Sequence, residues 1–600
     1  MQYRPKNRAS ASVRTRRTSG TPLILPEEVS ATATVPVNTF MVPPVSYKQS
    51  AGRWSLFFMV VAGLLLAVLY VVLARPLAHS TANIDPVRRS WLLSWVPIVH
   101  HWHMFVPAQV WDKVPWLLPV TEEGRVNLLL VALGAAVLCL LFAWLAGIRI
   151  GRVPLELGRG RTAFWIMLVF TAIFALTVFC SPIGLDAFSL DMLSSALYGR
   201  MVVMYHVNPY TVAPEVFAAD PLQILRASIL HTSNPLPVTS FGPVLTDINI
   251  LVALAARGSV DGTLLGFRVL GALAHLCSAV VLWQILAQMQ PQRRVSLTLL
   301  YAWNPFVLIF GIVQAHPQMI LILFVLLAIY FFQRNAPILT WFFVLLAAMI
   351  DLSCLLILPL FLRIIVRQTR FLWWFWRFCW WLGLLAVTAL SAALAYAPYW
   401  QGWGIAGLWS SLRVQFWQDT AVNSLDAALL HLPIHFPQEV MWLLQPDHWM
   451  IVTLVAVAIF LFFALWLADT LELALVCCGG VLLLFVTLQP QYWPWYTLFP
   501  LAIAFSSRSR GAAMLAFLLL LGTLLHIYLW QLNLVWPGEG LITIAVPCVL
   551  WGWGVFLVTA WRKLFGRAVT RPETRPMPLA RPPWFSRPSQ WNSRPGRGDL

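Results

Sequence analysis

Residues 163–183 read AFWIMLVFTAIFALTVFCSPI, an apolar run of 21 residues without a charge. Because a helix rises about 1.5 Å per residue, about 20 apolar residues are enough to cross the hydrocarbon core of a bilayer. In hydrocarbon, only helices and closed barrels satisfy every backbone amide, and the run lacks the alternation typical of a barrel strand. The stretch therefore predicts a transmembrane helix.

Comparable apolar runs recur on both sides of this one, the first two at residues 54–74 and 127–148. Hydrophobic residues make up 60% of the chain and charged residues 10%, far outside the range of soluble globular proteins. We therefore predict an all-α polytopic membrane protein with about 14 transmembrane helices, in a range of about 12–15, and with large extracytoplasmic loops.

The net charge of +17 is concentrated in the two tails of the chain. Residues 1–53 hold eight Lys/Arg and two Glu, whereas residues 562–600 hold nine Lys/Arg and two acidic residues, which gives +6 and +7. Both tails lack an apolar period, so we predict disordered cytoplasmic segments that flank a membrane domain at residues 54–561. Such tails suit anionic lipid headgroups, and we expect no nucleic-acid partner.

A basic loop sets the predicted orientation in the cell membrane. Four arginines follow the second apolar run: Arg149, Arg152, Arg159 and Arg161. Short loops rich in Lys and Arg face the cytoplasm, so the loop that follows residue 183 is predicted to be extracytoplasmic. The longest outer loops are then expected at residues 76–125, 184–245 and 399–449.

Two stretches do not follow a simple pattern of spans. Residues 237–289 look like two spans, yet only an odd number of crossings joins an outer Asp191 to an inner Arg293, so one of the two should be re-entrant or interfacial. The run at residues 336–362 is interrupted by Asp351. We predict two short helices that meet at this aspartate on the outer side.

The outer loop after the quoted span carries the chemistry. Residues 181–210 read SPIGLDAFSLDMLSSALYGRMVVMYHVNPY and contain Asp186 and Asp191 beside the membrane surface. Carboxylates at this boundary are either solvated loop residues or functional groups, because moving them into hydrocarbon costs several kcal/mol. A spacing of five places them on different faces of a helix, so we expect one of them to be the main base.

This loop resembles the first large loop of the GT-C superfamily of membrane glycosyltransferases. The resemblance is strongest to the bacterial polyprenol-phosphate-mannose-dependent alpha-mannosyltransferases. It is carried by residues that follow the family pattern in order: Ser189, Asp191, Ser194, Gly199, Asn208, Pro209 and Tyr210. SFGPVLTDIN from Ser240, YAWNPFVLI from Tyr301 and the PWY at Pro494 extend the likeness over residues 160–510.

The resemblance implies an enzyme that transfers a hexose, expected to be mannose, from a polyprenyl-phosphate donor. The acceptor would be a hydroxyl of an extracytoplasmic glycan or glycolipid, and the anomeric carbon would be inverted. In line with the family, Asp191 is the expected catalytic base, with Asp186 as the second candidate. The chain departs from the family pattern at His316-Pro317-Gln318 and at Asp351, where many relatives carry His-Asn-Asp and a lysine.

Five further residues are candidate substrate contacts. Arg200 and Arg413 could neutralise the leaving phosphate, or else contact lipid headgroups or water. His316 could contact the sugar phosphate or cap its helix, and His206 is equally compatible with a loop histidine. Tyr496 could stack on a sugar ring or belong to an interfacial aromatic belt.

We expect no required cofactor and no protein metal site. A divalent cation is chemically possible, but the chain has no clear Asp-x-Asp, and the HHWH at residues 100–103 reads as an interfacial helix. The alternative function is a polytopic transporter or lipid flippase, for which ionisable residues deep in a span are typical. A scaffold protein without activity is the third interpretation.

Overall fold

The computed structural model describes residues 45–74, 122–152, 157–179, 191–230, 236–369, 374–416, 421, 423–430, 434, 436–507 and 511–531. The chain divides into two units, residues 1–49 and 50–600, and the fold below is that of the second. Within the described ranges every regular element is a helix and no β-strand occurs, so the predicted all-α class is confirmed there.

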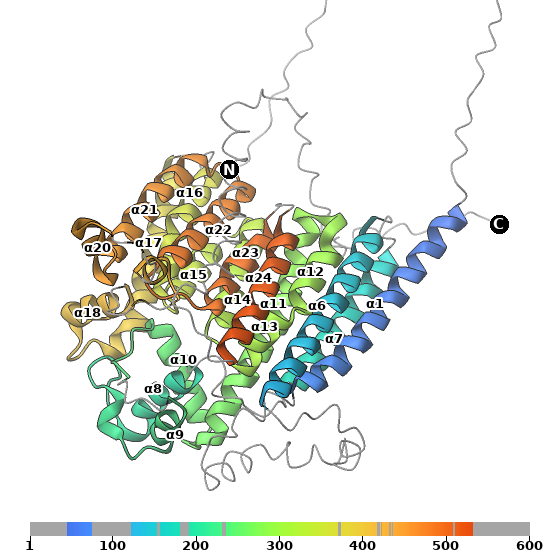
Figure 1. Cartoon of the computed structure of the whole chain (residues 1–600). Coiled ribbons are helices and arrows are strands. Elements are labelled where there is room, and N and C mark those ends of the chain that lie inside the picture. Colours follow the sequence, from blue (N-terminus) through green and yellow to red (C-terminus); the bar gives the residue numbers. More distant parts are fainter. Residues whose placement is uncertain are drawn as a thin grey trace, which may run out of the picture. The chain divides into compact units, whose positions relative to one another are not determined.

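Figure 1 gives the helices in chain order. The first group is α1 (Val45–Ala74), α6 (Glu122–Arg152), α7 (Leu157–Phe179), α8 (Asp191–Tyr205), η3 (Pro214–Phe217), α9 (Pro221–Leu230), α10 (Pro243–Ala255) and α11 (Val260–Met289). The second is η4 (Pro291–Arg293), α12 (Arg294–Ala302), α13 (Pro305–Leu308), η5 (Ile309–Val313), α14 (Gln318–Gln333), α15 (Pro337–Ala348), η6 (Leu352–Leu356) and α16 (Leu358–Thr369). The third is α17 (Trp374–Tyr396), η7 (Ala397–Tyr399), α18 (Gly404–Phe416), α19 (Leu425–Leu430), α20 (Gln438–Leu443), α21 (Pro446–Leu467), α22 (Leu471–Leu488), η8 (Pro494–Thr497), α23 (Leu498–Ser506) and α24 (Ala512–Gln531).

Seven helices in the described residues are long and apolar enough to cross a membrane, or eight if one bent pair counts as a span. The first three, Trp54–Val71, Leu130–Gly151 and Gly160–Phe179, coincide with the predicted runs. Four shorter apolar helices of 10–17 residues accompany them. The total of about 14 spans stays a prediction, as do the domain boundaries.

Many apolar side chains on these helices face outward. In α17, for example, only 17% of the apolar window is buried inside the protein. Exposed Trp374, Leu385 and Leu394 lie along this helix. A surface of this kind is unfavourable in water but matches lipid, which supports a membrane protein.

The core contains a tryptophan that joins three helices. Trp303 is fully buried and donates from its indole nitrogen to the carbonyl of Met167 in α7, at 3.2 Å. Its own carbonyl accepts from the Tyr70 hydroxyl of α1, at 2.9 Å. Phe170 and Phe174 pack edge-on against its ring. These contacts fix the break between α12 and α13 against the first helices of the chain.

That break follows directly from an Asn-Pro pair. Asn304 accepts a hydrogen bond from the backbone N–H of Phe306, and Pro305 is the first residue of α13. Proline cannot continue the preceding hydrogen-bond ladder, so the chain bends by 47° between the two segments. The YAWNPF motif singled out in the sequence is therefore a helix kink.

Each of the two stretches that did not follow a simple pattern contains at least one short helix in the structure. In residues 237–289, α11 is long enough to span a membrane, whereas α10 has 13 residues and is not. The run at 336–362 is broken at Asp351, as predicted, into α15 and α16 with η6 between them. Helix α1 begins at Val45, nine residues before the apolar window that starts at Trp54.

Candidate functional site

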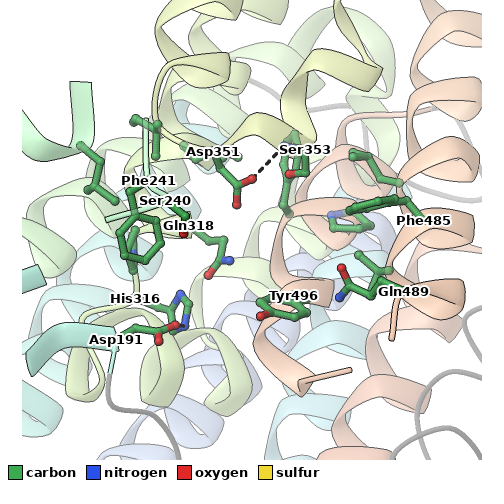
Figure 2. A pocket seen from close by; sticks show the side chains of 18 residues that line it. Asp191, Ser240, Phe241, His316, Gln318, Asp351, Ser353, Phe485, Gln489 and Tyr496 are labelled. Atoms are coloured by element: carbon green, nitrogen blue, oxygen red, sulfur yellow. Dashed lines mark hydrogen bonds and ion pairs between the residues drawn. The ribbon is translucent and has the colours of Figure 1, made fainter. Parts of the chain in front are cut away.

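A cavity of about 190 Å³ lies where several helix ends meet. This volume is below the about 300–1,000 Å³ of drug-sized ligand pockets, so it suits one compact group. Figure 2 shows the side chains around it. The lining residues are Asp191, Ser240, Phe241, Leu245, His316, Pro317, Gln318, Leu321, Ile350, Asp351, Ser353, Leu482, Phe485, Val486, Gln489, Tyr496, Phe499 and Pro500.

Asp191 reaches the cavity from the first position of α8. The amino-terminal end of a helix carries a partial positive charge, which stabilises a carboxylate there. The Asp191 side chain is 33% exposed, and its Oδ2 lies 2.6 Å from Nε2 of His316. A carboxylate that is partly open to the cavity and close to an imidazole is a suitable proton acceptor.

His316 is held by an irregular turn between two helices. The π-helical turn η5 ends at Val313, Ala315 adopts a left-handed conformation with φ +46°, and the His316 N–H donates to the carbonyl of Phe310. Pro317 then leads into α14. The imidazole is almost fully buried and lies 5.3 Å from the ring of Trp495. Such π-turns are frequent at functional sites, where they aim one side chain.

Arg268 of α11 forms hydrogen bonds to the backbone before Asp191 and to the backbone before His316. Its guanidinium donates to the carbonyl of Phe179, the last residue of α7, at 3.0 Å, and to that of Val313 at 3.2 Å. Phe179 precedes the connection to Asp191, and Val313 lies three residues before His316. A buried arginine that serves backbone carbonyls in this way is a positioning residue.

Asp351 enters the cavity from the break between α15 and α16. Its Oδ1 accepts a hydrogen bond from the Ser353 N–H, at 2.8 Å, which caps η6. The neighbouring wall is fixed by Gly242, whose N–H donates to the carbonyl of Ile350 at 3.1 Å. A Cβ on Gly242 would collide with the carbonyl oxygen of Met349, so glycine is required for this close approach.

Tyr496 lines the cavity from η8, a short helix that lies about 300 residues after α8 in the sequence. Burial raises the pKa of its hydroxyl, and the negative charges of Asp191 and Asp351 raise it further. The hydroxyl therefore stays protonated near neutral pH, as a hydrogen-bonding group beside both carboxylates. The structure thus brings together three of the predicted site residues: Asp191, His316 and Tyr496.

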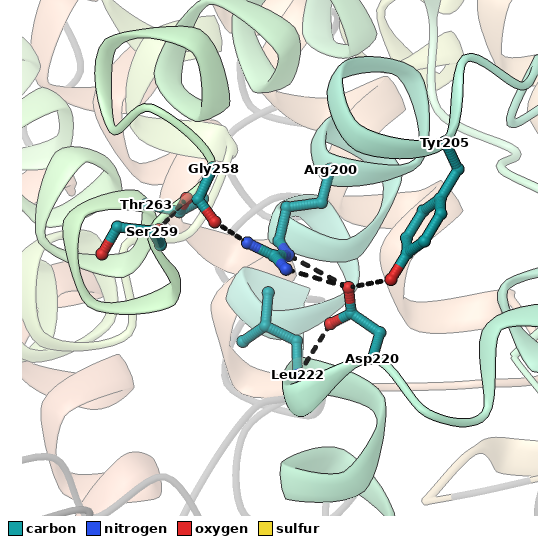
Figure 3. A network of polar contacts seen from close by, with 7 residues as sticks. All are labelled: Arg200, Tyr205, Asp220, Leu222, Gly258, Ser259 and Thr263. Carbon is teal, nitrogen blue, oxygen red and sulfur yellow. Dashed lines mark hydrogen bonds and ion pairs between the residues drawn. The ribbon is translucent and has the colours of Figure 1, made fainter.

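Arg200 lies elsewhere, in a buried network farther along α8 (Figure 3). Its Nε and Nη2 donate to Oδ2 of Asp220 at 3.2 and 3.0 Å, and it also donates to the carbonyl of Gly258. Asp220 accepts further bonds from the Tyr205 hydroxyl and the Leu222 N–H. This network joins α8, α9 and the turn before α11, so the geometry makes Arg200 structural rather than a residue of the cavity.

The remaining predicted residues do not line the cavity. His206 is exposed just after α8, with φ +54°, and Arg413 is exposed on α18. Asp186 and the histidines of the HHWH motif lie outside the described residues. Within the described ranges, no group of three or more His, Cys, Asp or Glu side chains is placed to hold a metal ion.

The Asn-Pro-Tyr turn supports the cavity indirectly. Asn208 donates from Nδ2 to the carbonyl of Tyr399 at 2.9 Å, and its Oδ1 accepts from the Tyr210 N–H. The Tyr210 hydroxyl donates to the carbonyl of Phe241 at 2.8 Å. Because Phe241 lines the cavity, the turn fixes one of its walls.

Gln318, Asp351 and Gln489 are among the polar lining residues that were missed as substrate contacts in the sequence. Asp351 stood out only as a break in an apolar run. Gln318 begins α14, and Gln489 follows α22 in the segment LQPQYWPWY. The signal was present in each case as a polar residue at the end of an apolar helix.

Comparison with known families gives a match over residues 101–367, to the family described as alpha-(1->6)-mannopyranosyltransferase, N-terminal domain. The matched range contains Asp191, His316 and Asp351, while α22, η8 and α23 beyond it complete the cavity. The comparison with curated proteins finds no match. Residues 101–367 are therefore similar to an alpha-(1->6)-mannopyranosyltransferase family, and the resemblance to membrane mannosyltransferases predicted from the sequence is confirmed.

Proposed function

We propose that the protein transfers mannose from a polyprenyl-phosphate donor to a hydroxyl of an extracytoplasmic glycan or glycolipid, with inversion at the anomeric carbon. The observation that carries this proposal is Asp191, which stands at the cavity with its Oδ2 2.6 Å from His316. The mannosyltransferase-family match over the same part of the chain supports the sugar and the reaction class.

Asp191 is the proposed general base. In an inverting transfer the acceptor oxygen attacks the anomeric carbon, the bond to the donor phosphate breaks, and the acceptor proton goes to the carboxylate. His316 orients Asp191 through the short contact between the two side chains. A general base of this kind typically raises the rate of the chemical step by about 10²–10⁴-fold.

The leaving group is a phosphate that needs no general acid, but its charge must be stabilised. Among the described residues that line the cavity there is no lysine or arginine. His316, when protonated, supplies positive charge next to the reacting centre. The apolar helices around the cavity suit the polyprenyl tail, which stays in the bilayer while the sugar is transferred.

The proposed orientation rests on α7. The arginine-rich segment around Arg159 and Arg161 lies at its amino-terminal end, and the connection to Asp191 follows its carboxyl-terminal end. If the arginines face the cytoplasm, the cavity opens on the extracytoplasmic side. The transporter alternative has less support, because the buried charge of Arg268 in α11 serves backbone carbonyls instead of a transport path.

The test is transfer of radiolabelled mannose from a polyprenyl-phosphate donor, measured with membranes that contain the wild-type protein or Asp191→Asn. Asp447→Asn is a matched control, because Asp447 is an exposed aspartate of α21 that does not line the cavity. We expect transfer by the wild type and the control and almost none by Asp191→Asn. Equal transfer by all three proteins would remove Asp191 from its proposed role.

A further inference from the structure

We propose that Gln318, Asp351 and Gln489 form a subsite that recognises the hydroxyl groups of the hexose held beside Asp191. The inference deepens the proposed function and rests on it. The three side chains come from α14, from the break before η6 and from the end of α22, and they line one cavity. Figure 2 shows them on different walls around it.

Gln318 offers an acceptor without a partner. Its side chain is 8% exposed, and its Oε1 is buried with no hydrogen-bond partner among the described residues. A buried acceptor that lacks a hydrogen-bond donor is energetically unfavourable. A ligand hydroxyl that donates to this oxygen would remove that cost, so the position favours a ligand with an O–H group.

Gln489 offers the complementary donor. Its Nε2 is also buried, and within the part of the chain that the structure describes it has no hydrogen-bond partner. A sugar hydroxyl both donates and accepts one hydrogen bond or more. An acceptor on one wall and a donor on another therefore match a ring that carries several hydroxyls.

Asp351 adds a fixed carboxylate. The Ser353 N–H holds its Oδ1 at 2.8 Å, which restricts rotation of the side chain. A carboxylate has about four lone-pair sites, so it can accept from ligand hydroxyls in addition to this backbone donor. Charge-assisted hydrogen bonds of this type are about twice as strong as neutral ones.

The charged residues that line the cavity favour binding of sugar hydroxyls over binding of a phosphate. Two aspartates line it, and lysine and arginine are absent from its described lining. Carboxylates repel a phosphate but accept hydrogen bonds from hydroxyls. Phe241, Phe485 and Phe499 add apolar surface for the C–H face of a sugar ring. The cavity volume of about 190 Å³ also suits a single ring better than a lipid chain.

The test compares the mannosyl donor with each of its monodeoxy analogues, using the wild type, Gln318→Leu, Asp351→Asn and Gln489→Leu. The readout is kcat/KM for each donor. Gln333→Leu is the matched control, because Gln333 lies at the other end of α14 and does not line the cavity. Gln318→Met and Gln489→Met, which keep the side-chain length, replace any leucine variant that does not yield folded protein.

We expect the wild type and the control to use each monodeoxy donor that lacks a hydroxyl bound by the subsite about tenfold less well than the full donor, the loss typical of one hydrogen bond to a hydroxyl. Each subsite variant should lose this preference for one particular hydroxyl. Unchanged preferences in all three variants, with transfer intact, would overturn the subsite and leave the proposed function standing. Absence of any mannose transfer by the wild type would instead overturn the proposed function, and the subsite with it.

Discussion

Two positions along α8 place charged residues in opposite surroundings. At the start, Asp191 is 33% exposed, lines the cavity and contacts His316. Nine residues later, about 13 Å along the helix axis, Arg200 is paired with Asp220, whose side chain is 1% exposed. The carboxylate at the cavity remains accessible to a substrate, whereas both oxygens of the buried one are occupied by donors of the protein. One helix thus carries the proposed base and part of a buried structural network.

The strongest test of this contrast is Asp191→Asn, which should separate activity from stability. Loss of the base should lower mannose transfer by about 10²–10⁴-fold. The thermal unfolding midpoint of the detergent-solubilised protein should stay close to the wild-type value, because the side chain is partly exposed. A large fall in the midpoint would show that Asp191 is structural and would erase the contrast.

The opposite result is expected for Asp220→Ala. Removal of this carboxylate leaves Arg200 buried without its counter-charge, which costs about 3–5 kcal/mol of folding free energy. Thermal unfolding should report this loss directly. The double variant Arg200→Met, Asp220→Leu removes both charges and should recover much of the stability, whereas no recovery would mean that the pair is not the main contribution of the network.

His316→Asn tests the partner of the proposed catalytic carboxylate of Asp191. Nε2 of His316 lies 2.6 Å from Oδ2 of Asp191, so loss of the imidazole removes a group that positions the carboxylate. We expect kcat to fall by about 10–100-fold. KM should change little if His316 acts through Asp191. A rise in KM with unchanged kcat would assign His316 to substrate binding alone.

Gly242→Ala tests the cavity wall that contains Phe241 and Asp351. The added methyl would collide with the Met349 carbonyl and push the Phe241 segment away from Asp351. Overpacking of this kind costs about 1–3 kcal/mol. Both the unfolding midpoint and transfer should fall modestly. Gly134→Ala is the control, since a Cβ there meets no atom within 4 Å.

The smallest effect is expected for Asn208→Ala. This change removes one hydrogen bond to Tyr399 and one from the Tyr210 N–H, each worth about 0.5–1.5 kcal/mol net. Transfer should fall slightly, because the turn acts on the cavity only through Tyr210 and Phe241. A loss as large as that of Asp191→Asn would place the turn in direct contact with the substrate.

Much of the fold could be predicted because it depends on local patterns. Continuous apolar runs predicted the first three long helices, and a single aspartate predicted the break between α15 and α16. The match to a mannosyltransferase family was also foreseen, from the order of short motifs. These features need no knowledge of which helices are neighbours.

The site could be predicted only in part, because its residues meet through packing. Asp191 and Phe499 line the same cavity although about 300 residues separate them, and no spacing rule connects them. Arg200 was expected to contact phosphate because its partners, Asp220 and the Gly258 carbonyl, are distant in sequence and gave no local signal. Gln318 and Gln489 became candidates only when their amides were found unpaired in one cavity.

The guanidinium of Arg268 has a consequence for two segments of the site. It is bonded to the segment that precedes Asp191 and to the segment that precedes His316, through Phe179 and Val313. Removal of the guanidinium would therefore release the last described residue before Asp191 and the turn before His316 at the same time.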